Sequence, residues 1–249
     1  MSLTQRLLAA IERDERAVVL TIVEGEDVGA KLLVVEGEEP LGDAPPELAR
    51  EADDALRRAR NRVFEWEGRK VYAEVYARPP RLLVYGAVDT ADALCAAAQA
   101  VGWRTIVGDA RSKFATPERM PHADELIVAW PEDVLAQVAP DFHTALVTLA
   151  HDDKFDVPFL SGALASDAFY IGAIGSRRTQ EKRRARLLEA GVAEDELARI
   201  HGPAGLDIGA ETPAETAVAI LAEAMAVRAG RAGGPLRDKA GRISVGASS

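Results

Sequence analysis

The sequence predicts an α/β fold: a small N-terminal α+β domain (residues 1–77) followed by a doubly wound parallel sheet (residues 81–229). From residue 81 onward, apolar strands alternate with amphipathic helices, which is typical of a parallel sheet covered on both faces. Before residue 78, β-rich runs are separated by short turns, and Arg78-Pro79-Pro80 has the composition of a linker. Residues 230–249 are rich in Gly, Arg and Ser, and we expect a flexible tail there.

The N-terminal domain is predicted to consist of hairpins and two helices. Residues 3–13 carry a short amphipathic helical pattern, and Pro46 opens a helical stretch that ends near residue 61. Glycine-containing turns separate the β-rich runs. The predicted strands cover residues 18–23, 31–35, 62–66 and 70–76.

The second domain is predicted from its strand–helix alternation and from explicit helix signals. Thr212 and Glu215 form a capping-box pattern around Pro213, and Pro131 stands at the first position of another helix. Gly191 is the expected end of the helix that begins at residue 177. The predicted strands cover residues 81–85, 105–107, 125–129, 145–148 and 168–171. The predicted helices cover residues 89–101, 131–138, 156–164, 177–190 and 213–229.

Composition and charge exclude several classes of function. The 249 residues include 40 Asp and Glu against 30 Lys and Arg, and this net charge of −10 argues against a general binder of nucleic acid or of anionic membranes. No run approaches the ~18 consecutive apolar residues of a membrane span, and residues 1–6 lack the apolar core of a signal peptide. One cysteine, Cys95, and four histidines leave no internal disulfide and little for a metal site. We therefore expect a cytoplasmic protein without a structural metal.

The turn after the first strand of the second domain stands where a dinucleotide fingerprint is expected. Gly86 and Ala87 suit a tight turn, but the position that must be glycine for pyrophosphate contact is Val88. Asp89 adds a carboxylate where an anion would bind, and its alternative role, or that of Thr90, is to cap the helix.

An acidic residue near the end of the second strand of this domain also bears on whether the domain binds a dinucleotide. Asp109, twenty-three residues after Gly86, stands near the usual ribose-binding position. By itself it is weak evidence, and Val88 and Asp89 argue against standard NAD(P) binding.

A second strand–turn–helix segment favours an anion site. Gly172 and Gly175 precede Ser176, a good N-cap, and the helix then begins with Arg177 and Arg178. Cations in the first turn oppose the helix dipole, which indicates a compensating anion held by backbone amides, the serine hydroxyl and a guanidinium. The alternative is a solvated helix whose basic run, residues 182–186, pairs with surface acids.

Two further segments reach the same edge of the predicted sheet. His151 and Asp152 follow the fourth strand, where a histidine beside carboxylates can act as a base or as an oxyanion ligand, or can belong to a capping and turn cluster. Residues 200–212 form a glycine-rich loop that carries His201, Asp207 and Glu211. Such a loop allows backbone approach to a ligand, and a tight structural loop explains it nearly as well.

Two long segments, YIGAIGSRRT at residues 170–179 and IHGPAGLDIGAETP at residues 200–213, closely resemble motifs of the xanthine dehydrogenase accessory factor family (XdhC/CoxI). The resemblance covers residues 81–229 and implies a Rossmann-like fold there. It departs from the family where Gly-Ala-Gly-His would be expected, because Val88 and Asp89 fill the last two positions. Only His151 remains of a two-histidine segment, and no cysteine precedes Cys95, which is interpreted as a buried small hydrophobe.

The resemblance implies a maturation factor for a molybdenum hydroxylase. Such a factor would bind the molybdenum cofactor (molybdopterin) as cargo, support its sulfuration and deliver it to the apo-enzyme of xanthine dehydrogenase type, acting as a cofactor-binding chaperone with no assigned catalytic residue. Implied partners are that apo-enzyme and a second copy of the chain. The cofactor-binding residues we expect are Gly86, Ala87, Asp109, His151, Asp152, Gly172, Gly175, Ser176, Arg177, Arg178, Asp207 and Glu211.

In this scheme Ser176, Arg177 and Arg178 hold the terminal phosphate, while His151, Asp152 and Asp207 face the pterin or a second ligand. Two alternatives stay open. The same domain could serve an NAD(P)-dependent oxidoreductase, or the chain could be a partner protein that has lost ligand binding and only docks on a hydroxylase assembly.

Overall fold

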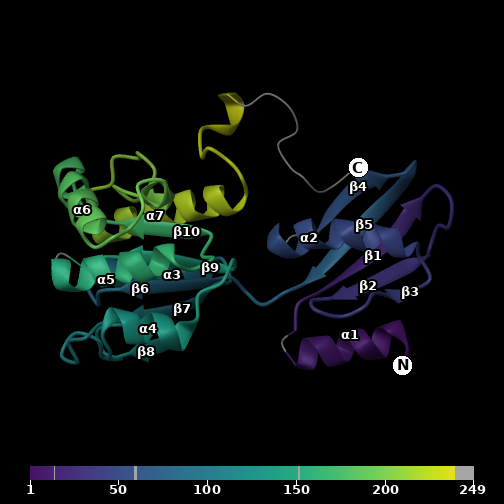
Figure 1. Ribbon diagram of the computed structural model, residues 1–249, viewed down its shortest axis with the longest axis horizontal. Coiled ribbons are helices and arrows are strands. Elements are labelled where there is room, and N and C mark those ends of the chain that lie inside the picture. The colour runs from purple at the N-terminus through teal and green to yellow at the C-terminus, as the bar shows by residue number, and fades with distance from the viewer. Residues whose placement is uncertain (14, 59–60, 151, 239–249) are drawn as a thin grey trace. The chain divides into compact units, whose positions relative to one another are not determined.

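The computed structural model describes residues 1–13, 15–58, 61–150 and 152–238. The chain divides into two compact units, one built on Met1–Arg78 and the other on Pro79–Gly233 (Figure 1). Within the described residues, no helix combines the length and the apolar character that crossing a membrane requires.

The first unit is a five-stranded antiparallel sheet in the order β3-β2-β1-β5-β4. Its central strand β1 has a continuous apolar run because both of its faces are buried: Val18, Leu20 and Ile22 pack in one core, and Ala17 and Val19 pack in the other. The strands are β1 (Ala17–Glu24), β2 (Lys31–Val35), β3 (Leu41–Gly42), β4 (Arg62–Trp66) and β5 (Arg69–Tyr76). The helices are α1 (Leu3–Glu12), a 3₁₀ turn (Pro46–Glu51) and α2 (Ala52–Arg58).

The second unit is a six-stranded parallel sheet in the order β11-β10-β9-β6-β7-β8. The chain enters at the centre, runs outward to β8, and then returns to β9 on the other side of β6. This is the strand order of the Rossmann fold, with its topological switch point between β6 and β9. The strands are β6 (Arg81–Tyr85), β7 (Arg104–Gly108), β8 (Glu125–Ile127), β9 (Thr144–Thr148), β10 (Tyr170–Ala173) and β11 (Ile200–His201).

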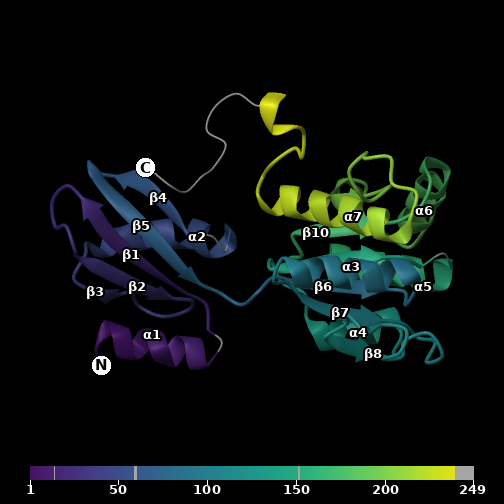
Figure 2. The same ribbon diagram turned by 180° about the vertical axis from the view of Figure 1, so that it is seen from behind.

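Helices cover both faces of this sheet. Alternate residues of β6 separate the two cores: Leu82 and Val84 pack on the α3 and α7 side, and Leu83 and Tyr85 pack on the α4 and α5 side. Figure 1 is viewed from the α4 and α5 side, and Figure 2 from the α3 and α7 side. The helices are α3 (Asp89–Ala100), α4 (Pro131–Val138), α5 (Asp153–Leu164), α6 (Arg177–Glu189) and α7 (Pro213–Arg228).

The predicted fold class is confirmed, and the capping box of Thr212 and Glu215 is present at the start of α7. Some element boundaries were wrong. Helix α5 begins at Asp153 rather than at residue 156, because the side chain of Asp152 caps it by accepting from Lys154 N. The single N-terminal helix expected after Pro46 is a 3₁₀ turn followed by α2, and the short strand β11 was not foreseen.

A buried polar network lies beneath the carboxyl edge of the parallel sheet. Thr148, the last residue of β9, donates through Oγ1 to Asp156 Oδ1 at 2.9 Å, and Arg183 Nε donates to Asp156 Oδ2. Arg183 Nη2 donates to the carbonyl oxygen of Ile174, in the β10–α6 loop, at 3.1 Å. Asp156 and Arg183 are each only 5% exposed. A charge buried to this extent costs free energy unless an opposite charge pairs with it, so each residue needs the other. The network therefore holds the start of α6 against α5 and β9.

Replacing Arg183 with Met should destabilise the protein by about 3–5 kcal/mol, because the Asp156 carboxylate is then buried without its cation. Arg184→Met is the matched control, because Arg184 lies next to Arg183 on α6 but pairs with Glu194 at the surface. We expect this variant to lose at most about 1 kcal/mol of the free energy of unfolding. Urea unfolding followed by circular dichroism measures both variants. Equal midpoints would contradict the stabilising role of the buried pair.

Candidate functional site

The first glycine turn joins β6 to α3 at the switch point of the sheet. Gly86 has φ +111°, and a Cβ there would lie 3.2 Å from both Ala150 N and the carbonyl carbon of Leu149. Both contacts are to the backbone that follows β9, so a side chain at this position would be strained in its own backbone and crowded by its neighbours. The turn and the end of β9 are packed directly against each other.

Asp109, one residue beyond β7, is hydrogen-bonded to this turn through Ala87 N. Its side chain is 2% exposed; Oδ2 accepts from Ala87 N at 2.9 Å and from Arg111 Nη2 at 2.8 Å. Oδ1 accepts from the backbone and Nε nitrogens of Arg111, both at 2.9 Å. Burial disfavours the charged form, but these hydrogen bonds outweigh it and hold the pKa of Asp109 below its ordinary value. The sequence predicts that Asp109 binds the cofactor; in the structure its carboxylate oxygens accept hydrogen bonds from Ala87 and Arg111.

The N-terminus of α3 carries further negative charge. Asp89 and Asp92 lie in its first turn, and Asp89, with a side chain 87% exposed, is 3.6 Å from Arg119. The alternative that Asp89 or Thr90 caps this helix is wrong, because the N-cap residue is Val88 and no side-chain hydrogen bond caps the helix. An anionic ligand approaching this helix would meet exposed carboxylate rather than open amides.

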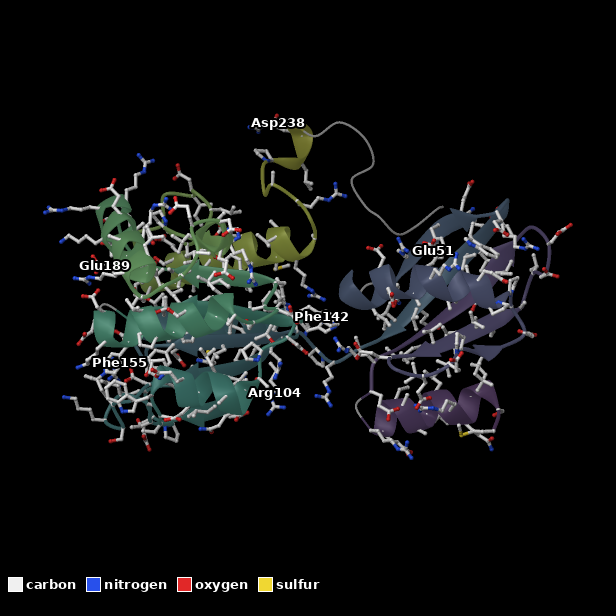
Figure 3. All side chains as sticks on the ribbon, in the orientation of Figure 1. Glu51, Arg104, Phe142, Phe155, Glu189 and Asp238 are labelled. Carbon is white, nitrogen blue, oxygen red and sulfur yellow. The ribbon has the colours of Figure 1, made fainter. Side chains whose placement is uncertain are left out.

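Arg111 is a second feature of this region, which the sequence patterns did not single out. Its guanidinium carbon lies 4.4 Å from the ring centre of Phe114 and 5.8 Å from that of Phe155. Phe155, labelled in Figure 3, also packs against Trp130, with ring centres 5.2 Å apart. The sequence signal was an arginine two residues after an Asp at a strand end, where a bidentate pair can form. Arg111 is thus a fixed, partly exposed cation at the carboxyl edge.

The second glycine turn, between β10 and α6, differs from the first because no acidic residue stands in the first turn of the helix that follows it. Gly175 has φ +131°, and a Cβ there would lie 2.9 Å from Thr179 Cγ2, so glycine is needed for both conformation and space. Ser176 is the N-cap of α6 and accepts from Thr179 N at 3.2 Å. No acidic residue stands in the first turn of α6, so its N-terminus is electrostatically open to an anion.

Apart from Arg183, which is buried against Asp156, the arginines of α6 divide into two groups. Arg184 pairs with Glu194 and Arg186 pairs with Asp153, as the solvated-helix alternative expected. Arg177 and Arg178 are exposed and form no ion pair or side-chain hydrogen bond with any residue that the structure describes. Among the described residues, the two cations nearest the helix N-terminus are therefore the arginines of α6 without a protein partner.

Gly172 and the loop after β11 are shaped by a carboxylate on α7. A Cβ at Gly172 would lie 2.7 Å from Tyr170 Cε1, so that ring occupies the space expected for a ligand. Glu223 Oε2 accepts from the Tyr170 hydroxyl at 2.6 Å and from Gly205 N at 2.7 Å, and Oε1 lies 3.2 Å from His201 Nδ1. The sequence patterns overlooked Glu223, although a carboxylate among the alanines of a packed helix requires buried partners.

The remaining predicted residues do not gather into one cluster. Asp152 caps α5 and pairs with Lys154, with Oδ2 and Nζ 3.1 Å apart, which is the capping alternative for this segment. Asp207 and Glu211 are exposed, and their side chains have no partner in the part of the chain that the structure describes. His151 lies outside the described residues.

The described residues contain no group of three or more His, Cys, Asp and Glu side chains that could hold a metal ion. Cys95 lies on α3 with 0% exposure, among the apolar residues of the core. Burial raises the pKa of its thiol to about 12. A buried, protonated thiol of this kind behaves as a small apolar side chain.

The fold and the site together define a Rossmann-type domain in which the first glycine turn is closed by its own carboxylates and the second is open to an anion. The model of the XdhC Rossmann domain matches residues 82–224, and the chain belongs to this family. The resemblance seen in the sequence is thereby confirmed.

Three curated relatives are similar to part of this chain. The chain is 34% identical over 149 residues to a probable xanthine dehydrogenase component of Bacillus subtilis, covering 60% of this chain and 43% of that protein. It is 31% identical over 156 residues to "Molybdenum cofactor insertion chaperone PaoD" of Escherichia coli, covering 62% and 42%. It is 33% identical over 165 residues to "Uncharacterized protein YqeB" of Escherichia coli, covering 66% and 30%. The chain thus spans less than half the length of each of these relatives.

A solved structure extends the likeness in fold to both units. The crystal structure of a xanthine dehydrogenase from Bacillus halodurans superposes with a TM-score of 0.68 at 22% identity, over 91% of this chain and 66% of that one. At this identity the likeness concerns the fold alone.

Cys95 should be inert in the folded protein, because its thiol is buried and almost wholly protonated near pH 8. Ellman's reagent should release close to one equivalent of chromophore in strong denaturant and almost none from native protein over the same period. Rapid stoichiometric labelling of native protein would contradict this placement of the thiol.

Asp109→Asn should lower the free energy of unfolding, and the difference from wild type should depend on pH. A carboxylate whose folded pKa is depressed contributes stability in full above its unfolded pKa of about 3.9 and loses it as pH falls through the folded value. Urea unfolding from pH 7 to pH 3 should therefore show a constant gap down to about pH 5 and a shrinking gap below it. A gap that widens on acidification would contradict the assignment.

Proposed function

We propose that this chain is an accessory factor that binds the molybdenum cofactor by its terminal phosphate and serves its sulfuration or insertion into a molybdenum hydroxylase of xanthine dehydrogenase type. The observation that carries the proposal is the pair Arg177 and Arg178 at the open N-terminus of α6, for which the described part of the chain supplies no partner. Family membership and the name of the relative PaoD support the choice of cargo.

The start of α6 has what a phosphate monoester requires. The first two amides of the helix, at Arg177 and Arg178, are donors that no turn of the helix itself can satisfy, and the helix dipole adds positive potential there. Two guanidinium groups can each donate charge-assisted hydrogen bonds to a dianionic phosphate. The cation pair, which opposes the dipole in the free protein, is compensated when the phosphate is bound.

The same geometry argues against the NAD(P)-dependent alternative. A dinucleotide in a Rossmann domain places its pyrophosphate on the first glycine turn and its ribose on the acidic residue after the second strand. Here Asp109 already accepts from Ala87 N in that turn, and the exposed Asp89 carboxylate stands at the start of α3. Binding a pyrophosphate there would require two negative groups to share one site.

In this proposal the molybdenum cofactor is the bound cargo, and the residues of this chain serve to hold it. The arrangement leaves Cys95 buried, so we assign the chain no sulfur transfer of its own; sulfur would be exchanged on the bound cofactor by another protein. Delivery then consists of release of the phosphate from α6 to the apo-enzyme.

The test compares two double variants on one helix. Arg177→Ala with Arg178→Ala should weaken retention of the molybdenum cofactor by at least about a hundredfold, since each of the two charge-assisted contacts contributes about 1.5–3 kcal/mol. Arg184→Ala with Arg186→Ala removes the same charge from the same helix but only from residues paired with acids, and should bind within about threefold of wild type. Cofactor released from a purified molybdoenzyme, kept anaerobic, is measured by co-elution.

Two outcomes would overturn the proposal. Wild type that retains no cofactor excludes the function itself. Equal losses in the two double variants would show that general positive charge, and not the α6 N-terminus, attracts the cofactor.

A further inference from the structure

The end of β11 carries a histidine held by a carboxylate. His201 Nδ1 lies 3.2 Å from Glu223 Oε1, and the His201 ring packs on the Tyr170 ring with centres 4.8 Å apart. Glu223, with a side chain 18% exposed, is fixed in turn because Oε2 accepts from the Tyr170 hydroxyl and from Gly205 N. The imidazole is therefore held on one face by a ring and on one edge by a carboxylate.

This arrangement decides which ring nitrogen carries the proton in neutral His201. An ionised carboxylate accepts hydrogen bonds and donates none, so Nδ1 must be the protonated nitrogen that faces Glu223. The other nitrogen, Nε2, is then a bare acceptor. It has no partner among the residues that the structure describes, and the side chain is 31% exposed.

The position of His201 places it beside the start of α6. Its strand partner in β10 is Gly172, three residues before Gly175. The next residue, Gly202, packs against Gln180 in the first turns of α6: a Cβ there would lie 2.3 Å from Gln180 Oε1. Gln180 Nε2 donates to Ala173 O at 3.0 Å. One contiguous set of contacts thus joins the histidine loop to the helix that carries Arg177 and Arg178.

We propose that His201, oriented by Glu223, binds the ligand whose phosphate lies at the start of α6. Its Nε2 accepts a hydrogen bond from an N–H or O–H group on the heterocyclic end of that ligand. This inference rests on the proposed function. A bare nitrogen lone pair does not suit a fully ionised phosphate, which has no proton to donate, whereas a heterocycle rich in N–H groups supplies the matching donor. Glu223 and Tyr170 do not touch the ligand and act as positioning residues.

Three variants separate binding from support of the loop. His201→Asn keeps an amide N–H near the position of Nδ1, facing Glu223, but has no atom at Nε2. His201→Gln reaches the Nε2 position with an amide oxygen. Glu223→Gln keeps an oxygen for Tyr170 and Gly205 but turns an N–H₂ group toward His201, which favours the tautomer with the proton on Nε2.

The expected result is a pattern across these variants. His201→Asn and Glu223→Gln should weaken retention of the molybdenum cofactor by about five- to tenfold, the effect of one hydrogen bond, while His201→Gln recovers most of it. Thermal midpoints should not follow that order. In wild type without ligand, a long-range ¹H–¹⁵N spectrum should show His201 as the Nδ1–H tautomer, and Glu223→Gln should reverse it.

An Nε2–H tautomer in wild type would overturn the inference whether or not cofactor binds. So would His201→Asn with wild-type retention, or losses that track the thermal midpoints. These results differ from failure of the proposed function: if wild type retains the cofactor and the Arg177, Arg178 double variant loses it, only the role of His201 falls. If wild type retains none, both fall.

Discussion

The ion pair between Asp156 and Arg183 is the interaction on which the candidate site depends. It lies at the base of the carboxyl edge, where α5 supplies the carboxylate, α6 supplies the guanidinium and Thr148 supplies a hydroxyl from the end of β9. Arg183 also donates to the Ile174 carbonyl oxygen, so the same side chain that joins the helices fixes the loop that leads into α6. Because burial makes the pair costly to break, the turn at Gly175 and Ser176 is held in one place. Such a fixed turn is what the proposed phosphate site requires.

The two glycine turns of the sheet illustrate how one fold can open or close an anion site. In both, a positive-φ glycine leads from a strand into a helix. The first turn donates Ala87 N to the internal carboxylate of Asp109, which Arg111 neutralises in place. The second has a serine cap and two exposed arginines and no acid in its first turn. A Rossmann domain therefore need not bind a dinucleotide at its usual turn, because a single buried carboxylate can take the position of the ligand.

Patterns of residues along the chain predicted the fold class and most strands and helices of the second unit. Strands and helices repeat their apolar residues with different periods, and the starts of α6 and α7 carry a recognisable capping residue. Val88 and Asp89 also argued against standard NAD(P) binding at the first turn, although Gly86, Ala87 and Asp109 were still expected to bind the cofactor. The patterns could not predict that Arg183 is buried, because in the sequence it stands in a basic run that is typical of a solvated helix. Its partner Asp156 lies 27 residues away in the sequence, and the two meet only because α5 packs on α6. The patterns also did not reveal the hydrogen bond from Ala87 N to Asp109, because that contact depends on how β7 and β6 align. Glu223 and His201 meet for the same reason, through a strand and a helix that adjoin only in three dimensions.

An anionic ligand should enter at the second glycine turn and not at the first. Backbone amide shifts in a ¹H–¹⁵N spectrum report this directly when the protein is titrated with molybdenum cofactor, because the amides at the two helix starts belong to different residues. We expect the largest shifts at Ser176, Arg177 and Arg178, followed by the loop at residues 201–205. Shifts concentrated at Ala87, Val88 and Asp89, with residues 176–178 unmoved, would contradict it.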